Sequence, residues 1–288
     1  MALIALAVWW RFGPVPSDPQ PSETFAAETQ VCGTPNRPCV VGQRSYSALM
    51  PKGTGPFPAV LFFHGAGQSG AGTISNGFLA DPLLKRGYAL IAPDALDITY
   101  GDGRQGSGWI WEGRRGMRDD YRFVRSVLTD AEQKFPIDPE RVIVAGFSYG
   151  ATFAWYLACA NRYLIFRFFA PIGGTPVRGR LLKCGTVRPR FHMMHMHGTA
   201  DTVFPVSGSY ASDNWPGWLG AEEAIAGLAE RARCLKNETV QDGSADVTVW
   251  RRCRSGNDIR VVLVPDGHQL PVDWADRAVD WFEAVSAK

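Results

Sequence analysis

The sequence predicts an α/β fold, a mostly parallel, doubly wound sheet in a single domain. Short apolar runs alternate with longer helical patterns along the chain, which is typical of strands joined by covering helices. Four of the apolar runs are followed directly by the polar, glycine-containing segments HGAGQ, GFSYG, HGTAD and PDGH. Because ligands of such sheets bind beyond the carboxyl ends of the strands, we expect the four segments to converge at one edge.

The elements are expected in the following order along the chain. An antiparallel edge strand covers 44–49, and buried strands cover 60–63, 89–92, 142–145, 166–172, 191–196 and 261–264. Helices are expected over 74–86, 117–135, 152–160, 221–235 and 272–285. Residues 247–252 and 259–264, separated by a short polar segment, are expected to form a hairpin late in the sheet.

Length and composition fit one globular domain. The chain has 288 residues, of which 45% are hydrophobic and 12% aromatic, and a formal net charge of +2, which provides no electrostatic footprint for nucleic acid. The apolar stretch after Met1 is too short to span a bilayer, and a Pro- and Ser-rich stretch continues to Glu23. We interpret residues 1–27 as a signal remnant or flexible segment and residues 28–288 as the folded domain, without stable membrane insertion.

The cysteines indicate the kind of cellular compartment in which the protein folds. There are six of them: Cys32, Cys39, Cys159, Cys184, Cys234 and Cys253. An even number of cysteines behind a signal-like start favours disulfides, and therefore a secreted or periplasmic protein. Six cysteines allow 15 connectivities, among which pairing of nearest neighbours is our preferred hypothesis. The sequence has no C-x-x-C pair, so we do not expect these cysteines to bind metal.

The segment GFSYG marks Ser148 as a candidate nucleophile. The run 142–145 predicts a buried strand, and the alanine- and aromatic-rich segment from Ala151 predicts a helix. Gly146 and Gly150 allow a tight turn, because two backbones can approach closely where no Cβ intervenes. A serine in such an elbow is held in a strained conformation with its hydroxyl exposed. The motif alone is weak in a chain with 31 glycines, so a base and an acid must support it.

A histidine and a carboxylate complete the expected constellation. His268, in the loop beyond the last strand, can fold back over the serine as a general base. Asp201, in HGTAD, is expected to orient the imidazole, and the chain order Ser148, Asp201, His268 is that of an α/β-hydrolase triad. Asp266 is the weaker alternative, since a carboxylate two residues from the histidine is poorly placed to align its ring.

The other histidines are expected to have structural roles. His64, in HGAGQ, should hold the backbone of its loop, and His192 and His195 should pack within the sheet. Alternation along the strand places His195 and His197 on one face and His192 on the other. This segment is not expected to bind metal, because threonine and alanine stand where an H-x-H-x-D-H pattern needs aspartate and histidine.

Two backbone amides are expected to stabilise a developing oxyanion. One is the N–H of Tyr149, directly after the serine, and the other comes from HGAGQ, for which we choose Ala66. The glycines of HGAG let that loop turn its amides inward. HG-x-G followed about eighty residues later by G-x-S-x-G is far more specific than either motif alone.

A family resemblance rests on four segments in order: HGAGQ, GFSYGA, HGTADTVFPV and PDGHQLP. They resemble the polyhydroxybutyrate depolymerase-like and feruloyl esterase-like branch of the α/β-hydrolases and, more distantly, the dienelactone hydrolases. The resemblance runs from about residue 32 to the final helix. It implies carboxylester hydrolysis without a cofactor, and it favours the disulfide pairs Cys32–Cys39, Cys159–Cys184 and Cys234–Cys253.

Two features depart from that family pattern. The elbow continues Tyr149-Gly150-Ala151 where many such esterases have a double glycine, and because the sequence stops at Lys288 we expect no C-terminal polymer-binding domain to follow. We therefore do not expect efficient attack on solid polyester.

Aromatic side chains near the expected catalytic edge bear on the substrate. Trp109 and Trp111 follow the second buried strand, and Trp215 and Trp218 follow the HGTAD loop. Their indoles can stack on a sugar or a phenolic group, or alternatively pin long loops to the domain. Together with Gln68 of HGAGQ they are the expected substrate-binding residues.

The sequence as a whole predicts a serine carboxylesterase that hydrolyses short-acyl, hydroxycinnamoyl or carbohydrate esters through an acyl-enzyme. The expected partner is a small-molecule or oligomeric ester, with no cofactor and no nucleic acid. A depolymerase of polyhydroxyalkanoate or other polyester oligomers is the alternative. A peptidase with the same triad is a hypothesis of another class, weakened because the sequence shows no β-propeller or second domain to gate peptides. A non-catalytic binding protein on a hydrolase fold is a further hypothesis, weakened by the intact triad and elbow glycines.

Overall fold

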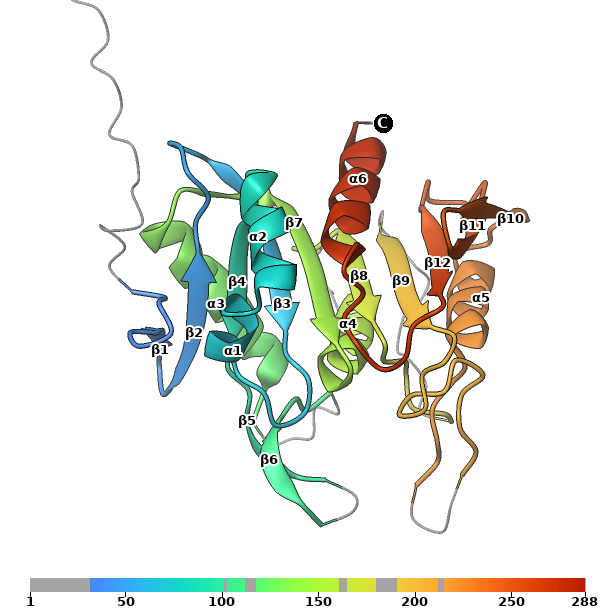
Figure 1. The fold of residues 1–288 in the computed structure, drawn as a ribbon, viewed down its shortest axis with the longest axis horizontal. Coiled ribbons are helices and arrows are strands. Elements are labelled where there is room, and N and C mark those ends of the chain that lie inside the picture. The colour runs from blue at the N-terminus through green and yellow to red at the C-terminus, as the bar shows by residue number, and fades with distance from the viewer. Residues whose placement is uncertain are drawn as a thin grey trace, which may run out of the picture.

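The structure is a computed structural model of the chain (Figure 1). It describes residues 32–287 except for 101–102, 112–117, 161–164, 180–190 and 212–214. The N-terminal segment 1–27 lies outside the described residues, so the boundary at residue 28 stays a prediction.

A ten-stranded sheet forms the centre of the molecule, in the order β1-β2-β4-β3-β7-β8-β9-β12-β11-β10. Neighbouring strands from β4 through β12 in that order run parallel, whereas the pairs at both ends of the sheet are antiparallel. This confirms the mostly parallel sheet. The strands are β1 (Cys39–Val41), β2 (Arg44–Leu49), β3 (Phe57–Phe63), β4 (Ala89–Pro93), β7 (Ile137–Phe147), β8 (Phe168–Ile172), β9 (His192–Gly198), β10 (Lys236–Asp242), β11 (Ala245–Arg251) and β12 (Ile259–Val264).

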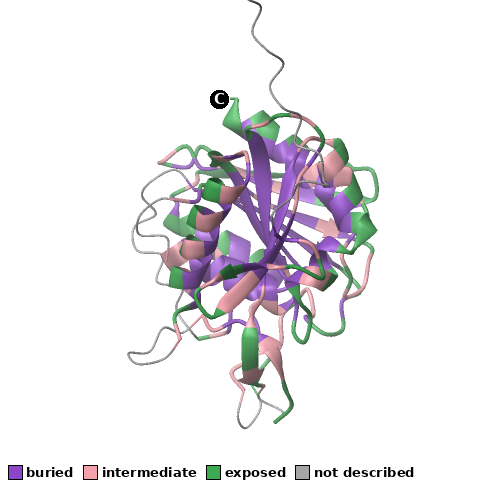
Figure 2. Cartoon of the chain, turned by 90° about the vertical axis from the view of Figure 1, so that its left-hand side faces the viewer, coloured by how far each residue is buried: buried purple, intermediate pink, exposed green. Residues whose placement is uncertain are grey.

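Helices cover both faces of the sheet (Figure 1). The first face carries α1 (Gly70–Ile74), α2 (Gly77–Lys85) and α6 (Trp274–Ser286), whose buried residues form one apolar cluster with β4, β8 and β12. The second face carries α3 (Asp120–Lys134), α4 (Tyr149–Ala160) and α5 (Ala221–Arg231), packed on the alternate side chains of the same strands. Figure 2 shows the buried strands in purple between these helices. The doubly wound arrangement is therefore confirmed.

Several elements differ from the sequence prediction. The predicted helix 74–86 is two helices, because Asn76 caps the second one by accepting a hydrogen bond from the Phe78 N–H at 3.1 Å. The strand 44–49 is not the edge of the sheet, since β1 pairs beyond it. The late hairpin is confirmed as β11–β12, but β10 continues it outward. A separate hairpin, β5 (Leu96–Thr99) and β6 (Gln105–Gly108), was not anticipated.

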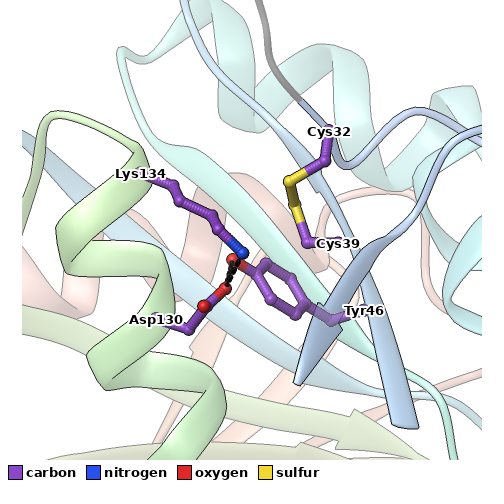
Figure 3. Close-up of a disulfide and its surroundings, with 5 residues drawn as sticks. All are labelled: Cys32, Cys39, Tyr46, Asp130 and Lys134. Carbon is purple, nitrogen blue, oxygen red and sulfur yellow. Dashed lines mark hydrogen bonds and ion pairs between the residues drawn. A yellow bond between two sulfur atoms is a disulfide. The ribbon is translucent and has the colours of Figure 1, made fainter. Parts of the chain in front are cut away.

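The Cys32–Cys39 disulfide joins the segment before β1 to the first residue of that strand, as predicted (Figure 3). On the neighbouring strand β2, the buried Tyr46 hydroxyl donates to the Asp130 carboxylate of α3 at 2.7 Å, and Lys134 lies 2.8 Å from the same carboxylate. Burial, reinforced by Asp130, raises the pKa of Tyr46, so the phenol stays a neutral donor. These contacts join the N-terminal hairpin to α3.

A second predicted disulfide, Cys234–Cys253, joins the end of α5 to the segment after β11. Cys159 is also disulfide-bonded, while its predicted partner Cys184 lies outside the described residues. No cysteine in the described part of the chain is free.

Candidate active site

Ser148 sits in a sharp turn between a strand and a helix. Strand β7 ends at Phe147 and helix α4 begins at Tyr149, so a single residue changes the direction of the chain. The φ angle of Ser148 is +57°, in the left-handed region that costs energy for a residue with a Cβ. Its N–H donates to the Ile172 carbonyl of β8 at 3.0 Å, and its carbonyl accepts from the Thr152 N–H at 3.1 Å. The predicted elbow is therefore present and held by backbone hydrogen bonds.

The two glycines of the elbow are required by close backbone contacts. A Cβ on Gly150 would lie 2.0 Å from the Phe63 carbonyl oxygen of β3. A Cβ on Gly146 would lie 2.5 Å from the Gly150 backbone. Both distances are far below van der Waals contact, so only glycine permits β3, β7 and α4 to meet at this point.

Ser148, His268 and Asp201 form a continuous hydrogen-bonded chain. His268 Nε2 lies 3.0 Å from Ser148 Oγ, and His268 Nδ1 lies 2.7 Å from Asp201 Oδ2. The other Asp201 oxygen, Oδ1, accepts from the N–H groups of Val203 and Phe204, both at 2.8 Å. The Asp201 side chain is fully buried. Its position fixes which imidazole nitrogen carries the proton, because the carboxylate can only accept.

The rival carboxylate lies elsewhere. Asp266 accepts a hydrogen bond from the Gln269 side chain at 3.2 Å. The carboxylate that pairs with the His268 imidazole is that of Asp201. The structure thus brings together the three residues that the sequence singled out and places Asp266 outside the chain of hydrogen bonds.

Two aromatic rings hold the imidazole of His268. The Phe147 ring lies on one side at 4.8 Å between centroids, and the Phe204 ring stacks on the imidazole at 5.6 Å with an interplanar angle of 9°. Packing of this kind limits rotation of the imidazole and keeps Nε2 directed at Ser148. No role was predicted for either phenylalanine, although Phe147 lies within GFSYG and Phe204 within HGTADTVFPV.

A buried chain of rings supports the Asp201 loop. Trp155 Nε1 donates to His195 Nδ1 at 3.3 Å, His195 Nε2 lies 3.0 Å from His197 Nδ1, and His197 Nε2 lies 2.7 Å from the Phe204 carbonyl. An indole N–H only donates and a carbonyl only accepts, so we assign both imidazoles as neutral Nε2–H tautomers. Burial lowers the pKa of both histidines, which agrees with this assignment.

This relay of Trp155, His195 and His197 contacts the site at Phe204, and His197 Nε2 also lies 3.6 Å from Asp201 Oδ2. The Phe204 carbonyl accepts from His197, its N–H donates to Asp201, and its ring stacks on His268. The sequence indicated packing for His195 but no specific role for His197. Strand alternation placed His195 and His197 on one face, but nothing in HMMHMH indicated that their rings are hydrogen-bonded to each other.

The HGAGQ loop is folded by its own side chains. His64, which is buried, is placed to donate from Nδ1 to the Gly65 carbonyl at 2.8 Å and accepts the Ala95 N–H at Nε2. The Gly65 N–H donates to Gln68 Oε1 at 2.9 Å, and the Gly67 N–H donates to the Ser107 carbonyl at 2.9 Å.

The backbone N–H of Ala66 in this loop takes no part in these hydrogen bonds. Within the described residues, the N–H of Ala66 has no protein acceptor, and Ala66 is exposed. The loop lies against the nucleophile, because a Cβ on Gly65 would be 3.4 Å from the Ser148 Cβ. The Ala66 amide is thus available to a negatively charged oxygen near Ser148.

The β5–β6 hairpin braces this loop. Ser107 Oγ donates to the Gln68 carbonyl at 2.5 Å, and the Tyr100 hydroxyl donates to the Ser107 carbonyl at 2.5 Å. Arg118 anchors the hairpin to α3 by pairing with the buried Asp120 at 2.9 Å and donating to backbone carbonyls of the hairpin. Arg118 is therefore part of the framework of the site.

The four predicted tryptophans fall into two groups. Trp109 is only 1% exposed, stacks on Phe153 at 5.0 Å and donates to the His64 carbonyl. It is a core residue, and we correct the prediction that it contacts substrate. The other three belong to an aromatic cluster with two further rings, made of Trp111, Tyr149, Phe204, Trp215 and Trp218.

The aromatic cluster lies directly beside the elbow. The ring of Tyr149 packs on Trp111 at 5.4 Å and on Trp218 at 5.9 Å, and Trp215 packs on Trp218 at 4.7 Å. Trp111 and Trp215 are half-buried, so parts of their faces remain accessible. The cluster therefore packs the loops together and also leaves part of Trp111 and Trp215 accessible from outside. The sequence left loop packing and substrate contact as alternatives.

Comparison with known proteins identifies the family. The model of the phospholipase/carboxylesterase family matches residues 45–216, more than half of the chain. The chain belongs to the phospholipase/carboxylesterase family. The matched region includes Ser148 and Asp201, and His268 lies beyond it.

Two curated relatives resemble parts of this esterase-family chain. Feruloyl esterase B of Piromyces equi is 25% identical over 184 residues, which are 60% of this chain and 34% of that protein. Acyl-protein thioesterase 1 of Saccharomyces cerevisiae is 28% identical over 165 residues, which are 51% of this chain and 71% of that protein. The chain thus spans only about a third of the feruloyl esterase it matches.

Solved structures share the fold over most of the chain. An acetyl xylan esterase from Aspergillus awamori superposes with a TM-score of 0.57 at 17% identity, covering 84% of this chain and 94% of that one. An S-formylglutathione hydrolase from Agrobacterium tumefaciens gives a TM-score of 0.56 at 12% identity, covering 85% and 89%. The fold is that of the α/β-hydrolases, as the sequence resemblance implied. No helix in the described part of the chain is long and apolar enough to cross a membrane.

Proposed function

We propose that this protein is a serine carboxylesterase that works through an acyl-enzyme. The observation that carries the proposal is the position of His268, which bridges Ser148 Oγ and the Asp201 carboxylate at 3.0 Å and 2.7 Å. A serine hydroxyl is a weak nucleophile unless an adjacent base removes its proton. Membership of the phospholipase/carboxylesterase family gives the same expectation independently.

In the first half of the reaction, Ser148 Oγ attacks the ester carbonyl carbon while its proton passes to His268 Nε2. Asp201 stabilises the imidazolium through Nδ1–H without taking the proton itself. The Tyr149 and Ala66 N–H groups donate to the carbonyl oxygen as it becomes negatively charged. The bond from carbon to the alcohol oxygen then breaks, and His268 Nε2 returns the proton to the leaving alcohol.

In the second half, water replaces the alcohol. His268 Nε2 accepts a proton from the water as its oxygen attacks the acyl carbon, and the same two amides hold the second oxyanion. The bond from carbon to Ser148 Oγ breaks, and the serine regains its proton from His268. The products are a carboxylic acid and an alcohol, so the cycle needs only water as a second substrate.

The proposed substrates are short-acyl, hydroxycinnamoyl or carbohydrate esters. Support comes from the aromatic cluster beside Ser148, whose partly accessible indoles suit flat rings and sugar faces. Similar proteins include a feruloyl esterase and an acyl-protein thioesterase, so a thioester is the second candidate. The same triad chemistry serves both bonds, because each reaction passes through an acyl-enzyme.

The experiment compares ester, thioester and amide substrates that share one acyl group. We expect kcat/KM to be highest for the ester and undetectable for the amide. The Ser148→Ala variant should lose at least about a hundredfold in kcat while keeping its unfolding temperature. Full activity of Ser148→Ala would refute the mechanism, a thioester preference would favour the second candidate, and amide turnover would indicate a peptidase. Selective turnover of hydroxybutyrate oligomers would favour a depolymerase.

We also propose that the protein is secreted or periplasmic. Two disulfides and the bonded Cys159 support an oxidising compartment. Thiol titration of the unfolded, unreduced protein should then find almost no free thiol. Six reactive thiols in material from its native host would contradict the assignment.

A further inference from the structure

A pocket that shares no lining residue with the aromatic cluster lies near the catalytic groups. It is a cavity of about 390 Å³ between the β3–α1 loop, α1, the start of α2 and the loop that follows His268. Its apolar lining is Phe62, Leu79, Phe147 and Leu270. This volume is near the lower end of the range for ligand sites, which suits one ring-sized group better than a long chain.

The polar lining of this pocket presents hydrogen-bond donors. Gln68 uses Oε1 to accept the Gly65 N–H, and Asn76 uses Oδ1 to accept the Phe78 N–H. The amide nitrogens of Gln68 and Asn76 have no acceptor in the described part of the chain, and each can donate two hydrogen bonds. None of the described residues that line the pocket is charged. An uncharged group rich in oxygen acceptors matches this chemistry.

The pocket adjoins the proton-transfer end of the site. Phe147, which lines it, packs on the imidazole of His268 at 4.8 Å, and Leu270 follows His268 by two residues. The aromatic cluster contacts the same imidazole through Phe204 at 5.6 Å. The β3–α1 and β12–α6 connections, which contribute to the pocket, lie at the same end of the sheet as the end of β7 (Figure 1). The imidazole of His268 thus contacts both a ring that lines the pocket, Phe147, and a ring of the aromatic cluster, Phe204.

We propose that this pocket binds the alcohol half of the substrate, and that this alcohol is an uncharged, hydroxyl-rich ring such as a sugar. The alcohol oxygen must come within hydrogen-bond reach of His268 Nε2, because that nitrogen protonates it as it leaves. One wall of the pocket is Phe147, which contacts the His268 imidazole, and the pocket offers N–H donors from which hydroxyl oxygens can accept hydrogen bonds. The acyl group then lies on the opposite side, against the aromatic cluster. This assignment rests on the proposed esterase function and adds the position and chemistry of its leaving group.

The test measures a ratio within each variant, the kcat/KM for a monosaccharide ester divided by that for the methyl ester of the same acid. Gly72→Phe blocks the pocket from its rim, where an added Cβ would meet only Ser69 Oγ at 3.4 Å. Asn76→Asp removes the amide donors yet keeps an oxygen that caps α2, since Asp and Asn cap helices equally well. Gly227→Phe, in α5 and with open space at its Cβ, is the matched control.

We expect the ratio to fall about tenfold or more in Gly72→Phe, because the sugar no longer fits. In Asn76→Asp it should fall about fivefold, mainly through KM of the sugar ester, as expected for one lost hydrogen bond. The control should keep the wild-type ratio. A ratio within about twofold of wild type in both pocket variants would overturn the proposal. So would a change in preference between two acyl groups on one alcohol. If wild type hydrolyses neither ester, the proposed function itself fails.

Discussion

Replacing Asp201 by asparagine should remove almost all activity while leaving the fold intact. In the native site, Oδ1 of this carboxylate accepts from two backbone N–H groups at 2.8 Å, and Oδ2 accepts from His268 Nδ1 at 2.7 Å. An asparagine can keep its oxygen on the two backbone donors, which places its NH₂ group against His268. The imidazole must then accept at Nδ1 and carry its proton on Nε2, where it faces Ser148 and cannot act as a base.

The opposite amide orientation does not rescue the base. It would set the NH₂ group against two backbone donors and leave both unpaired in a fully buried position, at a cost of about 1–3 kcal/mol each. The inactive tautomer is therefore favoured. A serine protease with the same substitution loses about 10⁴ in kcat, equivalent to about 5 kcal/mol of transition-state stabilisation, and we expect a loss of this size.

The assay is kcat on a p-nitrophenyl ester, with the unfolding temperature as the measure of fold. Asp266→Asn is the matched control, because this carboxylate is two residues from His268 but contacts Gln269. Its kcat should stay within about twofold of wild type. Retention of more than a tenth of the activity in Asp201→Asn, or a large loss in Asp266→Asn, would refute the assigned role.

Two further changes test the framework of the site. Gly150→Ala should destabilise the fold by about 1–3 kcal/mol, measured by urea unfolding, because the new Cβ overlaps the Phe63 carbonyl. Gly72→Ala is the control and should leave the free energy of unfolding unchanged, since its Cβ has room. Equal effects of the two substitutions would refute the contact argument. Burial lowers the pKa of His195 well below 6.5, so unfolding takes up a proton below about pH 6.5 and wild-type stability falls as pH decreases there. His195→Gln, which can keep both hydrogen bonds, should reduce that slope by up to about 1.4 kcal/mol per pH unit, and an unchanged slope would show that this histidine is not buried neutral.

The parallel core and the triad were predictable because their signals are strong and local. The six central strands each contain a run of residues buried on both faces, and close backbone contacts require glycine at both glycine positions of the Ser148 motif. Asp201 and His268 follow from the order of motifs and from the rule that strand ends meet at one edge. Those inferences need only sequence spacing and chain direction.

The missed elements lack such signals. The residues of β10 are all exposed, so its sequence KNETVQD shows no apolar alternation. The β5–β6 hairpin is short and contains QGSG, which composition alone assigns to a loop. The burial of Trp109 depends on its stacking with Phe153 from a helix more than forty residues later, a tertiary contact that no local pattern reveals.

The pocket near the triad and the aromatic packing around His268 could not be derived from the sequence either. The pocket lined by Gln68 and Asn76 forms only when α1, α2 and the His268 loop are in place. The contacts of Phe147 and Phe204 with the imidazole join residues that are far apart along the chain. Such positions are set by packing across the sheet edge rather than by motif spacing.

The most direct test of the central claim is covalent labelling by an alkyl fluorophosphonate, followed by peptide mapping with mass spectrometry. The reagent phosphonylates a serine only where a neighbouring base has activated it. We predict one adduct per chain, on the peptide that contains Ser148, with complete loss of esterase activity in step with labelling and no adduct in Ser148→Ala. Labelling of a different residue, or full esterase activity in quantitatively labelled protein, would contradict the assignment of Ser148 as the nucleophile.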